Sequence, residues 1–225
     1  MTWVKICGTT NLEDALTAVE AGADAVGFVF YEKSPRNISV EAAREIVEKL
    51  PESVEKVGVF VNEMADAVIG VSEEVGLDAV QLYPDAKYRF STVQGDFIER
   101  IRRRIFVAIP PRLVTRNGLF GFTLAKRNQV SAMFLDSGSA ERPGGTGKKF
   151  DWKNVALIAE GMRRMDLRLV VAGGLTPQNV GEAMTILQPW GVDVVSGVEA
   201  KPGKKDPKKV RAFVKAVRDA DRKVS

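Results

Sequence analysis

The sequence predicts an α/β protein, a single (βα)8 TIM barrel with parallel strands that spans residues 1–225. Short apolar runs rich in β-branched residues alternate with polar turns and stretches of helical periodicity, an order that fills or leaves room for eight units. The chain of 225 residues also has about the usual size of one such barrel. An open doubly wound sheet is the structural alternative. It would need a Gly-x-Gly-x-x-Gly turn where residues 7–10 are Cys-Gly-Thr-Thr.

The first strand is expected at residues 4–7 and the first helix at 11–21. Asn11 can cap this helix, because its side chain can accept a hydrogen bond from a free backbone N–H of the first turn. Gly22 ends the helix. The apolar run at 25–30 then predicts the second strand.

The next segments repeat this order. A helix over 39–50 begins at a serine that can cap it and closes at a proline. The third strand is expected at 57–61, and the third helix over about 64–75, where a glycine ends it. The run at 78–82 supplies the fourth strand.

Residues 83–130 are less regular than the rest of the chain. A fifth strand is expected at 105–109, where two prolines end it, and the signals for helices four and five are faint. Regularity returns with a sixth strand at 132–136, a glycine-rich loop at 143–147 and a helix over 152–162.

The last two units have clear boundaries. Strand seven is expected at 167–172, and a Thr-Pro pair at 176–177 opens the next helix in the favoured order of cap and then proline. A proline and a glycine within 189–191 end that helix. Strand eight follows at 192–195, and an Asp-Pro pair at 206–207 opens the final helix.

Two features of the composition narrow the possible chemistry. The chain has no histidine, which excludes Ser-His-Asp and Cys-His nucleophiles and the HExxH metal site. Cys7 is the only cysteine, which excludes an internal disulfide and a zinc site built from thiolates. Acid–base work must therefore use Asp, Glu, Cys, Lys or Tyr, and we expect no metal and no cofactor.

The net charge of +4 is concentrated in two basic runs, at 102–104 and 201–211. We interpret both as solvated outer faces near helix ends, because neither is interleaved with the aromatic residues of a single-strand-binding groove. No apolar run approaches the ~18 residues that suggest a membrane helix, and the N-terminus does not resemble a secretory signal. We therefore expect a cytoplasmic monomer or homodimer with neither a nucleic-acid nor a membrane partner.

The C-terminal ends of the strands hold the active site in barrels of this kind. Strand seven is followed by a pair of glycines, and strand eight by a serine and a glycine that would open a short helix. Such turns let backbone N–H groups approach an anion, so they predict a site for a phosphorylated small molecule. The loop at 143–147 is either a third phosphate-binding element, a mobile lid or a plain loop. The predicted phosphate-binding residues are Gly145, Gly147, Gly173, Gly174, Ser196 and Gly197.

Cys7 and Asp136 end strands one and six and are the candidates for acid–base work. A cysteine is most often a small core residue, but a position at the rim near a phosphate site would favour its thiolate. Asp136 follows an apolar run, so its carboxylate must be either paired or catalytic. An ion pair with Lys5 or another basic residue of the rim is the structural alternative.

Several ordered motifs at these strand ends together resemble the phosphoribosylanthranilate isomerases, barrel enzymes of tryptophan biosynthesis that carry out an Amadori rearrangement. The resemblance covers most of the chain. It rests on the segments at 4–8 (VKICG), 22–30 (GADAVGFVF), 34–36 (SPR), 57–61 (VGVFV), 135–136 (LD), 143–147 (PGGTG), 172–175 (AGGL) and 191–199 (GVDVVSGVE).

The resemblance implies a role for each of four residues. Asp136 would be the general acid that protonates the furanose ring oxygen and opens the aminoaldose to a Schiff base. Cys7 would be the general base that removes the C2 proton, giving an enolamine that tautomerises to the ketose. Arg36 would bind the anthranilate carboxylate, for which a guanidinium fork has the right shape, and Asp193 would support the sugar or the substrate amine.

One position departs from the family pattern. The family usually has a histidine after the Gln-Leu of strand four, and this chain has Tyr83, which keeps a hydrogen-bonding hydroxyl for the substrate. Two other functions remain open. One is a non-catalytic or divergent sugar-phosphate-binding barrel, and the other is a dual-substrate isomerase of histidine and tryptophan biosynthesis. The dual-substrate enzymes use paired carboxylates, one of which would stand where this chain has Cys7.

Overall fold

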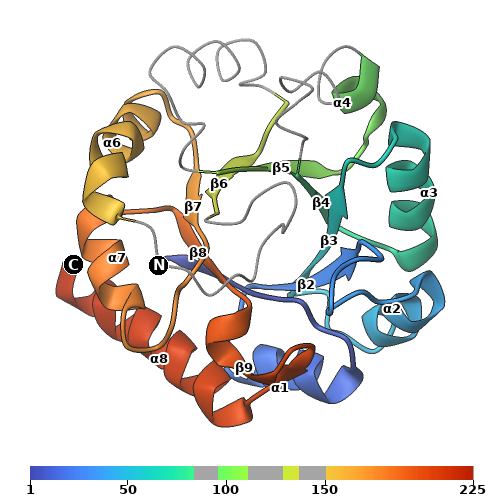
Figure 1. The fold of residues 1–225 in the computed structure, drawn as a ribbon, viewed down its shortest axis with the longest axis horizontal. Coiled ribbons are helices and arrows are strands. Elements are labelled where there is room, and N and C mark those ends of the chain that lie inside the picture. The colour runs from blue at the N-terminus through green and yellow to red at the C-terminus, as the bar shows by residue number, and fades with distance from the viewer. Residues whose placement is uncertain (84–95, 111–128, 137–150, 225) are drawn as a thin grey trace.

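The computed structural model describes residues 1–83, 96–110, 129–136 and 151–224. In this part of the chain eight parallel strands close into a barrel, each pairing with the next and β8 with β1 (Figure 1). The predicted (βα)8 barrel is confirmed, and closure excludes the open sheet. The strands are β1 (Trp3–Cys7), β2 (Ala25–Phe30), β3 (Glu55–Val61), β4 (Ala79–Tyr83), β5 (Arg104–Ile109), β6 (Ala132–Leu135), β7 (Leu169–Val171) and β8 (Gly191–Val194).

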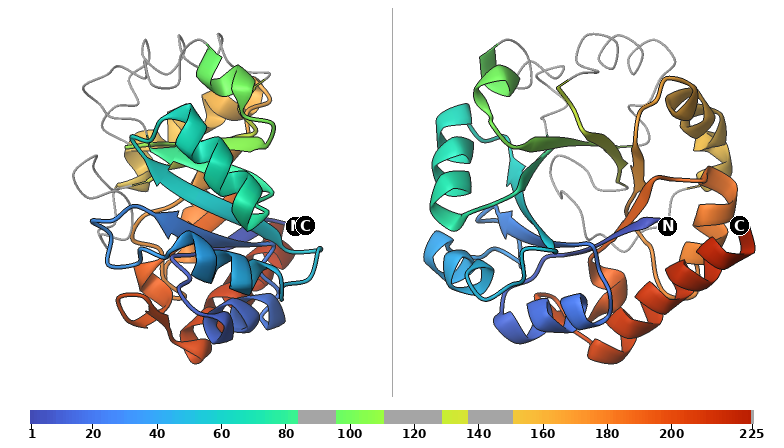
Figure 2. Two further views of the ribbon diagram at one scale, coloured as in Figure 1. Left: turned by 90° about the vertical axis from the view of Figure 1, so that its right-hand side faces the viewer. Right: turned by 180° about the vertical axis from the view of Figure 1, so that it is seen from behind.

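Helices surround the barrel and cover its outer face (Figure 2). Asn11 and Ser39 cap the first two as predicted, accepting hydrogen bonds from the backbone N–H of Asp14 and Ala42. No helix in the described ranges is both long and apolar enough to cross a membrane. The described α-helices are α1 (Leu12–Glu20), α2 (Val40–Val47), α3 (Ala65–Val75), α4 (Asp96–Arg100), α6 (Ala156–Arg164), α7 (Val180–Leu187) and α8 (Pro207–Val224).

Three predicted helix boundaries are wrong for local reasons. The helix expected to open at Thr176-Pro177 begins at Val180, because residues 177–179 form a turn first. The helix expected over 39–50 ends at Val47. Pro51 disfavours helical backbone at the residue before it, and residues 48–50 form a turn instead. The helix expected from residue 152 begins as a 3₁₀ turn, η4 (Trp152–Val155), and becomes α-helical at Ala156. The fifth predicted helix lies outside the described residues.

Apart from β2, the strands have bounds that differ from the predicted ones by one or two residues. Strand seven is shorter than expected, Leu169–Val171. Strand eight begins at Gly191, the glycine expected to end the preceding helix. A Cβ at this position would lie 3.0 Å from the backbone oxygen of Trp3 on β1, so the close approach of the two strands requires a residue without a side chain.

Side chains that alternate along the strands point into the barrel or toward the helices. Trp3 packs edge-on against Phe106 and Phe134, with ring centroids 5.7 and 6.2 Å away, and stacks on Trp190 at 5.1 Å. Because Trp3 begins β1, this aromatic cluster fills the N-terminal end of the barrel. The C-terminal end is left for a site. The inner apolar residues are Ala25, Val57, Ala79, Phe106, Ala108, Ala132, Phe134, Val170 and Ala172.

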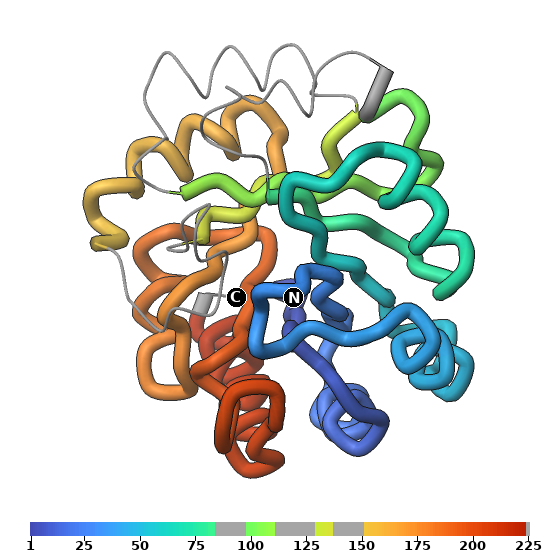
Figure 3. Tube along the Cα trace, turned by 45° about the vertical axis from the view of Figure 1, so that its right-hand side comes forward, coloured from blue at the N-terminus to red at the C-terminus, as the bar shows by residue number. Residues whose placement is uncertain are grey.

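The two ends of the chain lie close together (Figures 2 and 3). Thr2 donates hydrogen bonds to both carboxylate oxygens of Asp221, at 3.0 Å from its backbone N and at 2.6 Å from its Oγ1. Arg218 Nη1 donates to the backbone oxygen of Thr2 at 2.5 Å. These bonds tie α8 to the start of β1, next to α1 and α7.

We expect Trp3→Ala to lower the free energy of unfolding by about 3 kcal/mol, because it removes three ring contacts and leaves a cavity. Urea unfolding measures this change. Leu157→Ala is the control, since it truncates an apolar side chain that is 73% exposed and should change stability by less than about 0.5 kcal/mol. Similar losses in both variants would contradict the packing role of Trp3.

Candidate active site

The C-terminal ends of the strands bring the predicted acid–base residues to one end of the barrel. Cys7 is the last residue of β1, Tyr83 is the last residue of β4, and Asp136 directly follows β6. Cys7 and Asp136 keep only 4% and 3% of their surface exposed. Both groups are therefore largely shielded from water.

Cys7 lies among charged neighbours. Burial raises the pKa of its thiol, the positive charges of Lys5 and Lys205 partly oppose this rise, and the Asp193 carboxylate adds to it. Lys205 Nζ also donates to the backbone oxygen of Cys7 at 2.5 Å, which fixes the end of β1. A thiol with a raised pKa gives a strongly basic thiolate once it has lost its proton.

Lys5 forms a buried ion pair with Asp193 across the junction of β1 and β8. Its Nζ lies 3.0 Å from Asp193 Oδ1, and the two side chains are 0% and 2% exposed. Burial lowers the pKa of Lys5, but Asp193 and Cys7 outweigh burial and the pKa is raised above its ordinary value. The structure pairs Lys5 with Asp193, whereas the structural alternative considered from the sequence pairs it with Asp136.

Tyr83 is hydrogen-bonded to Asp136. Its hydroxyl donates to Asp136 Oδ2 at 2.5 Å, and Gln81 Nε2 donates to the same hydroxyl at 3.2 Å. Burial and the negative charge of Asp136 raise the pKa of Tyr83 well above its ordinary value, so the phenol remains a donor. Tyr83 stands where the family that the sequence resembles usually has a histidine. It therefore holds one oxygen of Asp136, the predicted general acid.

Arg36 lies in the loop after β2 and forms a bidentate pair with Glu199. Its Nε and Nη2 donate to the two carboxylate oxygens at 2.9 and 2.7 Å. Glu199 also accepts from Lys205 Nζ at 3.3 Å. The hydrogen bonds that Arg36 donates to Glu199 raise the pKa of Arg36. Burial alone would raise the pKa of Glu199, but the bonds from Arg36 and the charge of Lys205 lower it.

Lys205 corrects the interpretation of residues 201–211 as a solvated outer face. Lys201 and Lys208 are exposed as expected, but Lys205 is 1% exposed. It lies on the short hairpin of β9 (Glu199–Lys201) and β10 (Lys204–Lys205), and its backbone N donates to Asp14 Oδ2 on α1 at 2.7 Å. The hairpin lies beside α1 (Figure 1) and directs this lysine inward. Burial lowers the pKa of Lys205.

The turns after β7 and β8 lie against each other. Gly173 and Gly174 have φ values of 77° and 69°, a region that glycine enters without strain. A Cβ on Gly197 would lie 1.9 Å from the backbone oxygen of Leu175, so no other residue fits there without a shift. The helix expected from Gly197 is a single 3₁₀ turn, η5 (Ser196–Val198).

Some residues of this end of the barrel were not among the predicted site residues. The alternation along β1 offered one usable signal, because it puts Lys5 on the same inner face as Trp3 and Cys7. No comparable signal marks Glu199 and Lys205, because their positions depend on the β9–β10 hairpin. Gly145 and Gly147 lie outside the described residues. The residues that prediction missed are Lys5, Gln81, Glu199 and Lys205.

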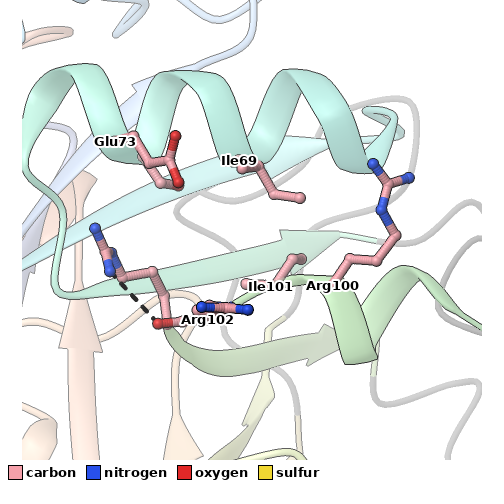
Figure 4. A pocket seen from close by; sticks show the side chains of 7 residues that line it. Ile69, Glu73, Arg100, Ile101 and Arg102 are labelled. Atoms are coloured by element: carbon pink, nitrogen blue, oxygen red, sulfur yellow. Dashed lines mark hydrogen bonds between the residues drawn. The ribbon is translucent and has the colours of Figure 1, made fainter.

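A separate cavity of about 170 Å³ lies outside the barrel, between α3 and the segment that joins α4 to β5 (Figure 4). Ile69 and Glu73 of α3 line one side, and Arg100 and Arg102 line the other. These residues belong to the outer layer, so the cavity is not part of the site at the strand ends. Within the described ranges no cluster of three or more His, Cys, Asp or Glu could hold a metal ion.

Comparisons with known proteins point to one family. A family model described as N-(5'phosphoribosyl)anthranilate (PRA) isomerase matches residues 4–216. The chain is 46% identical over 214 residues to an N-(5'-phosphoribosyl)anthranilate isomerase of Citrifermentans bemidjiense, covering 95% of this chain and 96% of the relative.

Two solved structures extend this similarity to the fold. One is phosphoribosyl anthranilate isomerase in complex with reduced 1-(o-carboxyphenylamino)-1-deoxyribulose 5-phosphate, with a TM-score of 0.78, 38% identity, and coverage of 97% of this chain and 100% of that one. The other is of mutually generated monomers of the dimeric enzyme from Thermotoga maritima, with a TM-score of 0.76, 40% identity, and coverage of 97% and 99%.

Glu199→Gln is expected to lower the free energy of unfolding at pH 7 by about 3 kcal/mol, because it leaves Arg36 and Lys205 without their carboxylate. The folded pKa of Glu199 lies below its ordinary value of 4.5. The stabilisation is therefore complete above that value and is lost as the pH falls through the lower, folded pKa.

Urea unfolding at several pH values measures this dependence. The difference between the wild type and Glu199→Gln should shrink below pH 4.5, the ordinary value. Glu160→Gln is the control, since Glu160 pairs with Arg164 on the surface of α6 and should change stability by less than about 1 kcal/mol. A Glu199→Gln difference that is the same at every pH would contradict the coupling.

Proposed function

The chain belongs to the N-(5'-phosphoribosyl)anthranilate isomerase family, and from this premise we propose that Cys7 and Asp136 carry the proton transfers of its reaction. The enzyme converts N-(5'-phosphoribosyl)anthranilate to 1-(2-carboxyphenylamino)-1-deoxyribulose 5-phosphate in tryptophan biosynthesis. This Amadori rearrangement turns an aldose derivative into a ketose derivative, so it needs an acid and a base but no change of oxidation state overall.

The observation that supports these roles is a buried thiol and a buried carboxyl at the strand ends of one barrel, in a chain without histidine. The raised pKa of Cys7 makes its thiolate a strong base. The hydrogen bond from Tyr83 holds the acid in one orientation. A dual-substrate isomerase would need a carboxylate where Cys7 stands. A barrel that had lost its catalytic activity would have no need to keep both Cys7 and Asp136.

The reaction proceeds through two proton transfers, one from Asp136 and one to Cys7. Asp136 donates a proton to the furanose ring oxygen, the bond from C1 to that oxygen breaks, and the nitrogen lone pair forms the Schiff base. Cys7 removes the proton from C2, and the C–H electron pair forms the enolamine while the nitrogen regains its lone pair. The enolamine tautomerises to the ketose. Tyr83 stabilises the carboxylate that Asp136 becomes after the first step.

Arg36 binds the anthranilate carboxylate in this proposal. A guanidinium has five N–H donors, and Glu199 uses two of them through Nε and Nη2, so the others can bind the substrate while the plane of the group stays fixed. Asp193 supports the sugar or the substrate amine while its Oδ1 accepts from Lys5.

The phosphate lies at the turns after β7 and β8. Gly173, Gly174, Ser196 and Gly197 supply backbone N–H groups that can approach the anion without a side chain in the way. Gly145 and Gly147, the other predicted phosphate-binding residues, lie outside the described residues.

The remaining proposals concern the molecule as a whole. Residues 1–225 form one barrel domain, and the closed ring from β1 to β8 supports this. The protein acts in the cytoplasm on a small phosphorylated substrate without a nucleic-acid partner. It is a monomer or a homodimer, and the dimeric relative from Thermotoga maritima supports the second state.

The activity is tested with phosphoribosylanthranilate generated in place, by following the loss of its anthranilate-type fluorescence as the purified chain is added. Cys7→Ser and Asp136→Asn should each lower kcat by about 1,000-fold, because each removes one proton-transfer group. Asp78→Asn, which changes a half-exposed carboxylate just before β4, should keep the wild-type rate. A near-normal rate in Cys7→Ser or Asp136→Asn, in a folded protein, would remove the role of that residue.

Tyr83→Phe should lower kcat by about 10- to 100-fold, because it removes a hydrogen bond to a group that becomes charged. The KM for phosphoribosylanthranilate should change little if the hydroxyl acts on Asp136 rather than on substrate. Tyr31→Phe removes the same atom from a half-buried tyrosine of the loop after β2 and is the control. A raised KM with an unchanged kcat would assign Tyr83 to substrate binding instead.

A further inference from the structure

Lys5 is a fully buried lysine that the proton transfers do not use. It lies two residues before Cys7 on the same inner face of β1. Its ammonium is held by Asp193 at 3.0 Å and lies 5.6 Å from the ring centre of Phe134. A charge buried so completely is costly to fold, so its retention at this place calls for a function.

The space beside Cys7 is shaped to bring the two groups together. In the pairing of β1 with β2, Cys7 lies opposite Gly27. A Cβ on Gly27 would lie 2.6 Å from Cys7 Sγ, 2.9 Å from Lys5 Cε and 3.0 Å from Lys5 Nζ. The ammonium and the thiol therefore share the volume that this glycine leaves empty.

The two buried lysines near Cys7 act on different atoms. Lys205 donates to the backbone oxygen of Cys7 at 2.5 Å and thereby fixes the strand end. Lys5 instead lies beside the thiol, next to the Cβ position of Gly27, where its positive charge acts on the sulfur. Asp193 Oδ1 lies 3.0 Å from Lys5 Nζ and keeps the ammonium charged.

We propose that Lys5 is a positioning residue, which orients the Cys7 thiol and stabilises its thiolate form, with Asp193 holding the ammonium in place. The proposal rests on the role of Cys7 as the general base and deepens it. Lys5 keeps its proton throughout the reaction, and the proton from C2 goes to sulfur. Gly27 contributes by leaving room for the contact.

The test is the pH dependence of Cys7 in Lys5→Met, a variant of similar length without the charge. Its kcat/KM at pH 7 should fall by about 100-fold, the scale of a general-base contribution. The rising limb of kcat/KM should move to higher pH by about one unit or more, because the thiolate loses a positive neighbour while the negative Asp193 remains.

The rate of alkylation by iodoacetamide reports the same ionisation without substrate. Cys7 is the only cysteine of the chain, so Cys7→Ser supplies the blank. Lys56→Met is the matched control, since Lys56 is another buried strand lysine, with its Nζ 3.7 Å from the Asp78 carboxylate at the opposite end of the barrel. It should leave both pH profiles unchanged.

The double variant Lys5→Met/Asp193→Asn guards against misfolding, since it removes the buried carboxylate that Lys5→Met leaves unpaired. The pH at which its alkylation rate rises should lie between the values for the wild type and Lys5→Met, because the double variant has lost both the positive and the negative charge that act on the thiol. The proposal would be overturned if the alkylation rate of Lys5→Met, or of the double variant, rose at the same pH as that of the wild type. Full turnover by Cys7→Ser would overturn the role of Cys7 as the base, whatever the alkylation limbs show.

Discussion

The pairing of β1 with β8 is the interaction on which the rest of the structure depends. It closes the ring and sets Lys5 opposite Asp193, two residues that are 188 positions apart in the sequence. The same closure brings the end of β1 to the hairpin that follows β8, where Lys205 holds the backbone of Cys7. The polar contacts at the base residue are therefore consequences of one strand register.

Charges buried at the strand ends oppose stability and favour function. The cations Lys5, Arg36 and Lys205 and the carboxylates Asp193 and Glu199 are all nearly inaccessible to water. Each must be paired, since an unpaired ion in such a place destabilises the fold by several kcal/mol. These buried cations suit a substrate that carries both a phosphate and a carboxylate. The aromatic cluster around Trp3 at the other end offers apolar contacts that help to offset this loss.

Sequence reasoning predicted what depends on local pattern. The eight strands, the caps at Asn11 and Ser39 and the fold class followed from periodicity and turn residues. The roles of Cys7 and Asp136 came from family motifs and remain proposals. What could not be predicted depends on contacts between distant segments. The basic run at 201–211 gave no sign that one of its lysines points inward, because the β9–β10 hairpin decides that direction. The bond from Tyr83 to Asp136 likewise joins β4 to the end of β6.

The hydrogen bonds that join Thr2 to Asp221 place the first strand and the last helix side by side. A closed ring of similar units has no intrinsic starting point. Which unit comes first in the sequence therefore does not change the architecture. A short peptide linker across this gap would make the backbone a continuous circle, and new ends opened in an exposed loop between units would leave the catalytic end of the barrel in place. This barrel therefore offers a scaffold for circular permutation, in which the order of the eight units can be rotated while their neighbours stay the same.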